Sequence, residues 1–313
     1  MNASLKGATY GVIAAVSYGM NPLFALPLYD EGLTVDSVLF YRFSLAALLL
    51  GVILKIRKQS LAISKREIFP LLLFGMIFSS SSWLFYQSFL YMDAGIACTI
   101  LFVYPVIVAL IMALFFKEHI SLLTCGCIAL ALTGIVLLYK GDGKASLSTI
   151  GMVLVMLGAL AYSIYIIGVN QSASLRNIPA GKLTFWAMLF GSLLFVVRLN
   201  LLTDLQPLVS TKAWVNTLSM AFFPTVISMV CISLAVHLIG STYTAILGAL
   251  EPVTALVFGV IVFNEQITPR IILGVILILL SASLIVSAKP LSQKLRTIRV
   301  RNRKIGDGRA ISR

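Results

Sequence analysis

Charged side chains are scarce in this sequence of 313 residues, because Asp, Glu, Lys and Arg together make up only 11% of it. Soluble proteins carry about 25% charged residues. Hydrophobic residues instead reach 59% of the chain. A globular core cannot hold so much apolar side chain without a sticky surface, whereas a bilayer accommodates it at lipid-facing positions. The composition therefore excludes an ordinary soluble protein and predicts an all-α integral membrane protein.

Residues that carry enzyme chemistry are also rare. The two histidines are His119, in a predicted turn, and His237, at a predicted helix end, and no Asp lies near the middle of an apolar segment. The cysteines fall inside apolar segments, where they suit packing better than disulfides or zinc; they are Cys98, Cys125, Cys127 and Cys231. Without a nucleophile–base pair, a metal cluster or a phosphate loop, we expect no catalytic residue, no metal, no cofactor and no enzyme.

Positive charge is abundant, with a net charge of +13, but it is concentrated at one end. Nine Lys and Arg follow the last apolar segment, and without them and Asp307 the other 288 residues carry a net +5. A basic tail after a membrane helix fixes orientation and contacts anionic lipid head groups. Since no nucleic-acid-binding fold accompanies the tail, we expect lipid rather than nucleic acid as its partner.

Ten apolar segments are long enough to be candidate membrane spans, which need about 20 residues each. They lie at roughly 7–28, 35–55, 69–91, 94–116, 121–140, 148–170, 181–201, 214–238, 242–263 and 268–288. Short connections between them predict a compact bundle of antiparallel neighbours. Placing both termini in the cytoplasm puts 18 Lys and Arg on the inner side and five on the outer side, which is the favoured orientation.

The fourth and ninth spans contain a repeat. "FVYPVIVALIMALFFKEHIS" (102–121) aligns without gaps on "ALEPVTALVFGVIVFNEQIT" (249–268), so Pro105 matches Pro252 and Glu118 matches Glu265. Tyr18 and Tyr162 occupy matching places in the first and sixth spans. Five spans separate the copies, so the halves 1–140 and 141–288 should have opposite topology, ahead of a tail at 289–313. Inverted repeats of this kind are typical of secondary transporters, although a duplication in a non-transporting protein would look the same.

These segments resemble the EamA-type units of the drug/metabolite transporter superfamily. The resemblance rests on "FYRFSLAALLL" (40–50), "YPVIVALIMALFFKEHIS" (104–121), "TCGCIALALTGIVLL" (124–138), "EPVTALVFGVIVFNEQIT" (251–268) and "LGVILILLSASLIV" (273–286). It implies ten helices in two inverted five-helix repeats. It also implies export of amino acids, other metabolites or drugs, without choosing among them. In this family an arginine recurs in the second helix, which favours a structural role for Arg42.

Two ionisable residues, Arg42 and Glu251, lie well inside predicted spans, where a charge costs several kcal/mol. Glu251 is about 14 Å from the inner edge of a core roughly 30 Å thick, near the midplane. A carboxylate there is a candidate proton-coupling site, and the alternative is a permanently protonated or arginine-paired structural group. Arg42 could pair with Glu251 if their helices are neighbours, or extend toward the surface.

Polar residues and prolines in the spans predict a central cavity. Pro105 and Pro252 should kink their helices and free carbonyls that must face protein or water. On the third span Ser79, Ser82, Trp83 and Tyr86 form one stripe, which indicates either a cavity wall or serines bonded back to their own helix. The candidate cavity residues are Tyr18, Asn21, Ser82, Trp83, Tyr86, Gln87, Tyr104, Tyr162, Tyr165 and Thr244.

The repeat glutamates, Glu118 and Glu265, end their spans just before Ser121 and Thr268. We expect them to be structural, with the nearby carboxylate or hydroxyl capping the next helix.

The sequence as a whole predicts a secondary-active transporter, an exporter of amino acids or other small metabolites that works by alternating access. It would lie in a bacterial inner membrane as a monomer or homodimer, with proton coupling at Glu251. A multidrug carrier or a passive uniporter of the same fold is an alternative, and so is a membrane sensor or scaffold that transports nothing. A channel would more naturally show a ring of charge or a carbonyl filter.

Overall fold

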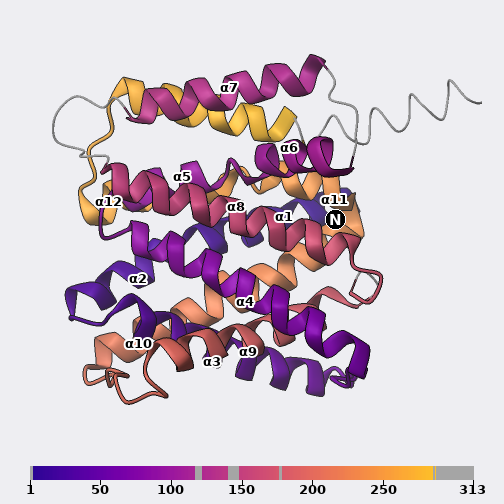
Figure 1. Cartoon of the computed structure of the whole chain (residues 1–313). Helices are drawn as coiled ribbons and strands as arrows, with labels where there is room; N and C mark the ends of the chain where they lie inside the picture. Colours follow the sequence, from indigo (N-terminus) through magenta and orange to yellow (C-terminus); the bar gives the residue numbers. More distant parts are fainter. Residues whose placement is uncertain (1–2, 117–121, 140–147, 176–177, 285, 287–313) are drawn as a thin grey trace, which may run out of the picture.

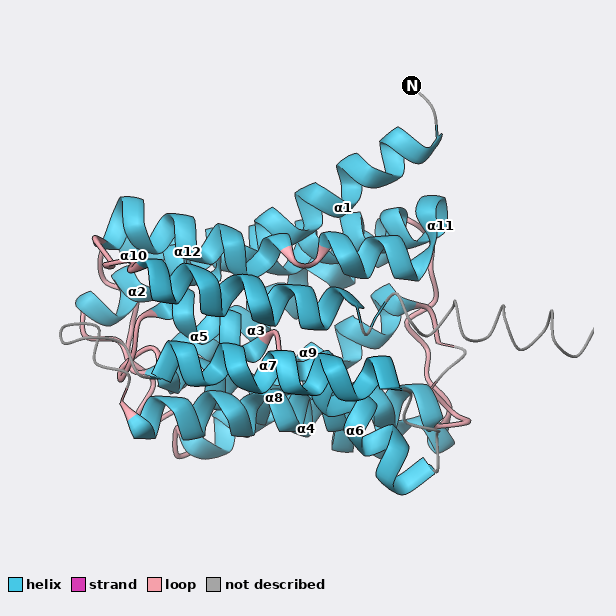
Figure 2. Ribbon diagram, turned by 90° about the horizontal axis from the view of Figure 1, so that it is seen from above, coloured by secondary structure: helices cyan, strands magenta, loops and turns pink. Residues whose placement is uncertain are grey.

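The computed structural model describes residues 3–116, 122–139, 148–175, 178–284 and 286. Within these ranges the chain is helical and contains no strand. The predicted basic tail and Glu118 lie outside the described residues. The helices run roughly side by side as one bundle, and most connections between them gather at its two ends (Figures 1 and 2).

The first half of the bundle contains α1 (Ala3–Gly19), α2 (Asn21–Asp30), α3 (Val35–Ile56), α4 (Lys65–Ser88), α5 (Ala94–Leu101), α6 (Tyr104–Phe116) and α7 (Leu122–Tyr139). The second half contains α8 (Thr149–Gln171), α9 (Ala180–Arg198), α10 (Thr211–Ala221), a π-helical turn η1 (Phe222–Ile227), α11 (Ser228–Leu247) and α12 (Leu250–Phe263), followed by a last helix, Pro269–Leu284.

Eight helices are long and apolar enough to cross a membrane, and two more, Leu122–Leu138 and Pro269–Leu284, are apolar but shorter. All ten coincide with the segments expected from the sequence. The two short ones occupy the fifth and tenth places. The structure thus supports an all-helical membrane protein, while the count of ten spans stays a prediction.

Two spans are interrupted at matching places in the repeat. The fourth span breaks between α5 and α6, and the ninth begins with a break between α11 and α12. Short backbone bonds bridge both breaks, from Val106 N–H to the Val103 carbonyl and from Glu251 N–H to the Gly248 carbonyl, each at 2.9 Å. The expected kinks are therefore helix ends just before each proline. Pro105 and Pro252 sit in the first turn of the following helix, where a missing N–H costs nothing.

Glycines allow several helices to pack closely. A Cβ on Gly75 of α4 would lie 3.1 Å from the Ala187 carbonyl oxygen of α9, and one on Gly191 would lie 3.1 Å from the Gly75 carbonyl oxygen. Gly134 of α7 and Gly274 of the last helix approach each other in the same way. Small residues at helix crossings are a common means of association in membranes, because they bring the two backbones into contact.

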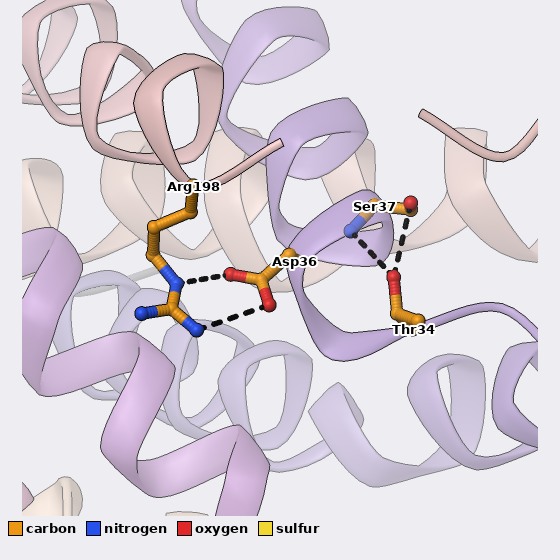
Figure 3. Close-up of polar contacts among 4 residues, drawn as sticks. All are labelled: Thr34, Asp36, Ser37 and Arg198. Carbon is orange, nitrogen blue, oxygen red and sulfur yellow. Dashed lines mark hydrogen bonds and ion pairs between the residues drawn. The ribbon is translucent and has the colours of Figure 1, made fainter. Parts of the chain in front are cut away.

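A polar cluster closes one end of the bundle, where α3 begins and α9 ends (Figure 3). Arg198 forms a two-pronged ion pair with Asp36, with Nη2 3.2 Å from Oδ2, and its guanidinium lies 4.1 Å from the centre of the Trp83 ring. The Thr34 hydroxyl caps α3 by accepting from the Ser37 N–H at 3.4 Å. By the charge count above, this is the predicted outer end.

Candidate functional site

A cavity of about 120 Å³ lies between the two halves of the chain. Both halves and both helix breaks contribute to its wall. The lining residues are Tyr18, Gly19, Asn21, Phe85, Cys98, Leu101, Phe102, Tyr104, Tyr162, Ser228, Met229, Ile232, Glu251 and Pro252. For comparison, an engineered protein cavity of about 150 Å³ holds one benzene molecule. The space therefore suits one small solute or a few waters.

Residues that occupy equivalent places in the repeat face the cavity in pairs. Tyr18 and Tyr162 are one such pair. Pro252 also lines the cavity, beside Glu251, whereas its repeat partner Pro105 does not. Tyr104 and Glu251, which are equivalent in the gap-free alignment, both line the wall. At this position the halves differ, because one supplies a phenol and the other a carboxylate. The repeat thus builds a roughly symmetric wall, and Glu251 makes it asymmetric.

Glu251 is the second residue of α12 and follows the break directly. Its backbone N–H bonds to the Gly248 carbonyl. No donor in the described part of the chain is within hydrogen-bonding distance of its carboxylate, and it forms no ion pair there. The phenols of Tyr18, Tyr104 and Tyr162 share the cavity wall with it. A partly buried carboxylate inside a membrane bundle, without a protein partner, requires a proton, a cation or water.

Aromatic rings form much of the remaining wall. The rings of Tyr104 and Tyr162 meet edge to face with centres 4.9 Å apart, and Phe102 meets Tyr104 at 5.8 Å. Behind Tyr162, the Tyr165 ring stacks at 6.1 Å. Ring faces attract cations and apolar bodies alike. Together with one carboxylate, they make a site suited to a solute with a protonated amine and an apolar part.

Arg42 lies one layer behind the cavity and is only 3% exposed. Its Nη1 donates to the Tyr86 hydroxyl at 2.5 Å, and its Nε donates to the Thr225 hydroxyl at 3.4 Å. The Tyr86 hydroxyl in turn donates to Asn21 Oδ1 at 2.7 Å. Arg42 therefore neither extends to the surface nor forms an ion pair with Glu251.

The structure brings some of the expected cavity residues together and not others. Tyr18, Asn21, Tyr104 and Tyr162 line the cavity, whereas Ser82, Trp83, Tyr86, Gln87, Tyr165 and Thr244 do not. Trp83 lies under Arg198 at the end of the bundle, and Thr244 bonds back to the Gly240 carbonyl at 2.8 Å.

Serines of α4 bond to backbone carbonyls. Such bonding was the alternative to a cavity wall for the polar stripe on this helix. The Ser79 hydroxyl donates to the Met76 carbonyl, and the Ser81 hydroxyl donates to the Gly158 carbonyl of α8. The residue of α4 that does face the cavity is Phe85, next to the predicted stripe. Sequence reasoning missed it, together with Cys98, Phe102 and Met229. Their closeness to the two helix breaks is the signal that could have found Cys98 and Phe102.

Glu265 contacts the other half of the chain instead of the helix that follows it. Its Oε1 accepts from the Ala94 N–H, at the start of α5, at 2.9 Å. The start of the last helix is capped by Thr268, whose hydroxyl accepts from the Ile271 N–H at 3.3 Å. Within the described ranges, no three His, Cys, Asp or Glu side chains gather in a way that could hold a metal ion.

A helical membrane bundle with an aromatic-walled cavity at two helix breaks is an architecture found in secondary transporters. The sequence comparisons agree, because residues 5–140 and 149–287 each match the sequence model of the EamA-like transporter family. The chain belongs to the EamA-like transporter family, which confirms the resemblance drawn from the sequence. The protein is therefore a membrane transporter.

Individual relatives are more distant. The chain is similar to a protein of Bacillus subtilis (strain 168) described as the uncharacterized transporter YdfC, with 25% identity over 255 residues, or 78% of this chain and 79% of the relative. A solved crystal structure described only as that of a protein is similar with a TM-score of 0.64 and 15% identity, over 92% of this chain and 98% of the other. At that identity the likeness shows the fold alone.

Proposed function

We propose that this protein is a secondary-active exporter of small metabolites that carry an amine, amino acids among them. Two five-helix halves of opposite topology would expose the cavity alternately to the two sides of a bacterial inner membrane. Both termini would lie in the cytoplasm, where the tail at 289–313 would contact anionic lipids. Glu251 would hold a proton when the amine is absent.

The observation that carries this proposal is the position of the Glu251 carboxylate. It lines the inter-repeat cavity beside a helix break, and no donor in the described ranges reaches it. A carboxylate in such surroundings is stabilised either by a proton or by a bound cation. Because one site cannot hold both at once, binding of the amine releases the proton and couples the two gradients.

The cavity wall supports an amine rather than an acid as the group recognised. Tyr104, Tyr162 and Phe102 present ring surfaces, and no Lys, Arg or His is among the lining residues. The positive charge nearby, on Arg42, already has two hydrogen-bond partners in Tyr86 and Thr225. An amino acid would place its amine at Glu251 and leave its carboxylate toward Asn21, Ser228 or water.

Transport into proteoliposomes tests the proposal. Purified protein would face a mixture of amino acids, apolar amines and hydrophobic cations, with and without a pH gradient, and uptake would be read by mass spectrometry. We expect flux of amine-bearing solutes that depends on the gradient and is lost in Glu251→Gln. Glu67→Gln is the matched control, because Glu67 caps α4 at the surface by accepting from the Ser64 N–H at 2.7 Å.

Other outcomes separate the alternatives. Gradient-independent flux that survives Glu251→Gln would make the protein a passive uniporter and Glu251 a structural group. Flux limited to hydrophobic cations would make it a multidrug carrier. Binding without flux of any solute would point to a sensor or scaffold and would contradict the proposal.

A further inference from the structure

Glu265 joins the two halves of the chain near one end of the cavity. It belongs to the segment after α12, yet its carboxylate accepts from the first N–H of α5, Ala94, at 2.9 Å. The same carboxylate fills a niche left by two missing side chains. A Cβ on Gly259 of α12 would lie 2.1 Å from Glu265 Oε2, and one on Gly95 of α5 would lie 2.9 Å from it.

The backbone directs the side chain into this niche. α12 ends at Asn264, which adopts a left-handed conformation with φ 55° and ψ 31°. The chain then reverses, and the Glu265 N–H bonds to the Gly259 carbonyl at 3.0 Å. This is the usual way for a helix to end at a left-handed residue. The reversal places the Glu265 side chain back along its own helix and against α5.

The helices joined in this way are the ones that must part if the cavity opens at this end. α5 lines the cavity with Cys98 and Leu101, and α12 lines it with Glu251 and Pro252. Each is a half-helix bounded by a break at the cavity. Separating α5 from α12 breaks the bond between Glu265 and Ala94 and empties the niche.

We propose that Glu265 is the closing contact of the cavity at this end: seated between Gly95 and Gly259 it holds α5 to α12, and it leaves when that end opens. The Glu265 carboxylate lies against Gly259, eight residues after Glu251, or about 12 Å further along α12. The two glutamates therefore have separate tasks, one at the cavity and one at its end. The inference rests on the alternating access proposed above.

Charges around Glu265 make this contact sensitive to pH. The pKa of Glu265 is raised to about 7, first by burial and then by the Asp93 charge, while the N–H groups of Ala94 and Gly95 act in the opposite direction. Burial also raises the pKa of Asp93.

Other titratable and charged groups surround Glu265. Cys98 faces Glu265 from α5, and Arg270, beyond α12, forms no ion pair with Glu265. At the end of α2, which also packs on α12, Glu31 is bonded to Ser210, and Asp30 forms no ion pair with a described residue.

The direction of the pH effect on the closed end follows from the raised pKa of Glu265. A neutral Glu265 still accepts from Ala94 through its carbonyl oxygen, and it avoids both the cost of burying a charge and repulsion by Asp93. An ionised Glu265 is more stable in water than in the niche. Protons therefore favour the closed end, and rising pH favours its opening.

Labelling of Cys98 tests the contact without any substrate. Cys98 lies one turn after Ala94 and faces the cavity. With Cys125, Cys127 and Cys231 replaced by alanine, an impermeant methanethiosulfonate reagent would be applied to membrane vesicles of each orientation at about pH 6 and pH 8. The variants would be Gly259→Ala, which evicts the carboxylate while Glu265 stays, Glu265→Ala and Glu265→Gln. Gly126→Ala is the control, because a Cβ on Gly126 meets no atom within 4 Å.

We expect Gly259→Ala and Glu265→Ala to label roughly tenfold faster than wild type at pH 6, because a hydrogen bond and its niche are lost. Gly126→Ala should match wild type. Dividing each rate by that of Glu265→Ala at the same pH removes the common effect of pH on the thiol and the reagent. The remaining effect of an ionised Glu265 on Cys98 is to suppress the thiolate, so it opposes the expected acceleration and does not imitate it. On that scale wild type should accelerate toward pH 8, whereas Glu265→Gln, which is neutral and can still accept, should not.

Two results would overturn the inference. One is equal labelling of Glu265→Ala and wild type at pH 6, which stays decisive if Gly259→Ala does not fold. The other is the same relative acceleration in Glu265→Gln as in wild type. Absence of flux in proteoliposomes would count against the proposed function and leave the labelling result readable.

Discussion

At the scale of single residues, the two charges inside the bundle have opposite surroundings. Arg42 is held by Tyr86 and Thr225, and Tyr86 is held in turn by Asn21. Glu251 has no such partner among the described residues. A charge with fixed partners stabilises one arrangement, whereas a charge without them gains or loses a ligand easily. We therefore propose that Arg42 is the structural member of the two and Glu251 the exchangeable one.

Tyr86→Phe tests the structural role of Arg42. Loss of the hydroxyl leaves Arg42 Nη1 and Asn21 Oδ1 with one partner fewer in a buried place, which costs about 1–3 kcal/mol. We expect a fall of several degrees in the melting temperature of the protein in detergent. Tyr29→Phe is the comparison, because its hydroxyl makes one long bond of 3.4 Å to the Tyr86 carbonyl. Equal losses in the two variants would contradict the role given to Tyr86.

Glu265 predicts a pH dependence of stability that Glu265→Gln should lack. Its pKa in the folded protein, about 7, is above the ordinary value of 4.5. The stability that the neutral form contributes is thus fully present below about pH 4.5 and is lost as the pH rises through 7. Between about pH 5 and pH 8, wild type should lose melting temperature relative to Glu265→Gln. A constant difference between the two would show that Glu265 does not titrate in this range.

At the scale of helices, close crossings at glycine hold the outer layer of the bundle. A Cβ on Gly134 of α7 would lie 2.7 Å from Ile278 Cγ1 and 2.9 Å from the Gly274 carbonyl oxygen. Gly134→Ala should therefore destabilise the protein by about 1–3 kcal/mol through overpacking. In Gly126→Ala, on the same helix and without neighbours, helix propensity alone should stabilise by up to about 1 kcal/mol. A lower melting temperature for Gly134→Ala and a higher one for Gly126→Ala would support the close packing of α7 on the last helix. Shifts of the same sign in both variants would contradict it.

The positions of the helices could be predicted from the sequence, but the faces they present could not. In a soluble helix the apolar side faces the core, so periodicity reveals the buried side. Here lipid and core are both apolar, and Phe85, Cys98 and Met229 look no different from residues that face lipid. Tyr18, Tyr104 and Glu251 were identifiable because the repeat or an isolated charge singled them out. Trp83 and Tyr86 are not among the lining residues, because polarity alone does not separate the cavity from the packed layer behind it.

The repeat links the helices to the molecule as a whole. Breaks in the fourth and ninth spans lie at equivalent places and meet at one cavity. The closing contact of Glu265 with α5 joins one half to the other at one end. Its repeat equivalent, Glu118, lies outside the described residues. When a contact between the two halves keeps the cavity closed, the cavity can open by rigid-body movement of the halves. The residues that line the cavity then keep their arrangement.

At the scale of the whole molecule, the proposed exchange at a single carboxylate would fix the charge moved in each cycle. If Glu251 carries one proton inward for each solute that leaves, export of a zwitterionic amino acid moves one net positive charge inward. Export of a singly charged amine moves none. Proteoliposomes with a potential set by potassium and valinomycin distinguish these cases. An inside-negative potential should accelerate amino-acid efflux and leave amine efflux unchanged. Potential-dependent amine efflux would require a second coupled charge, and Arg42 would then have to change its partners during the cycle.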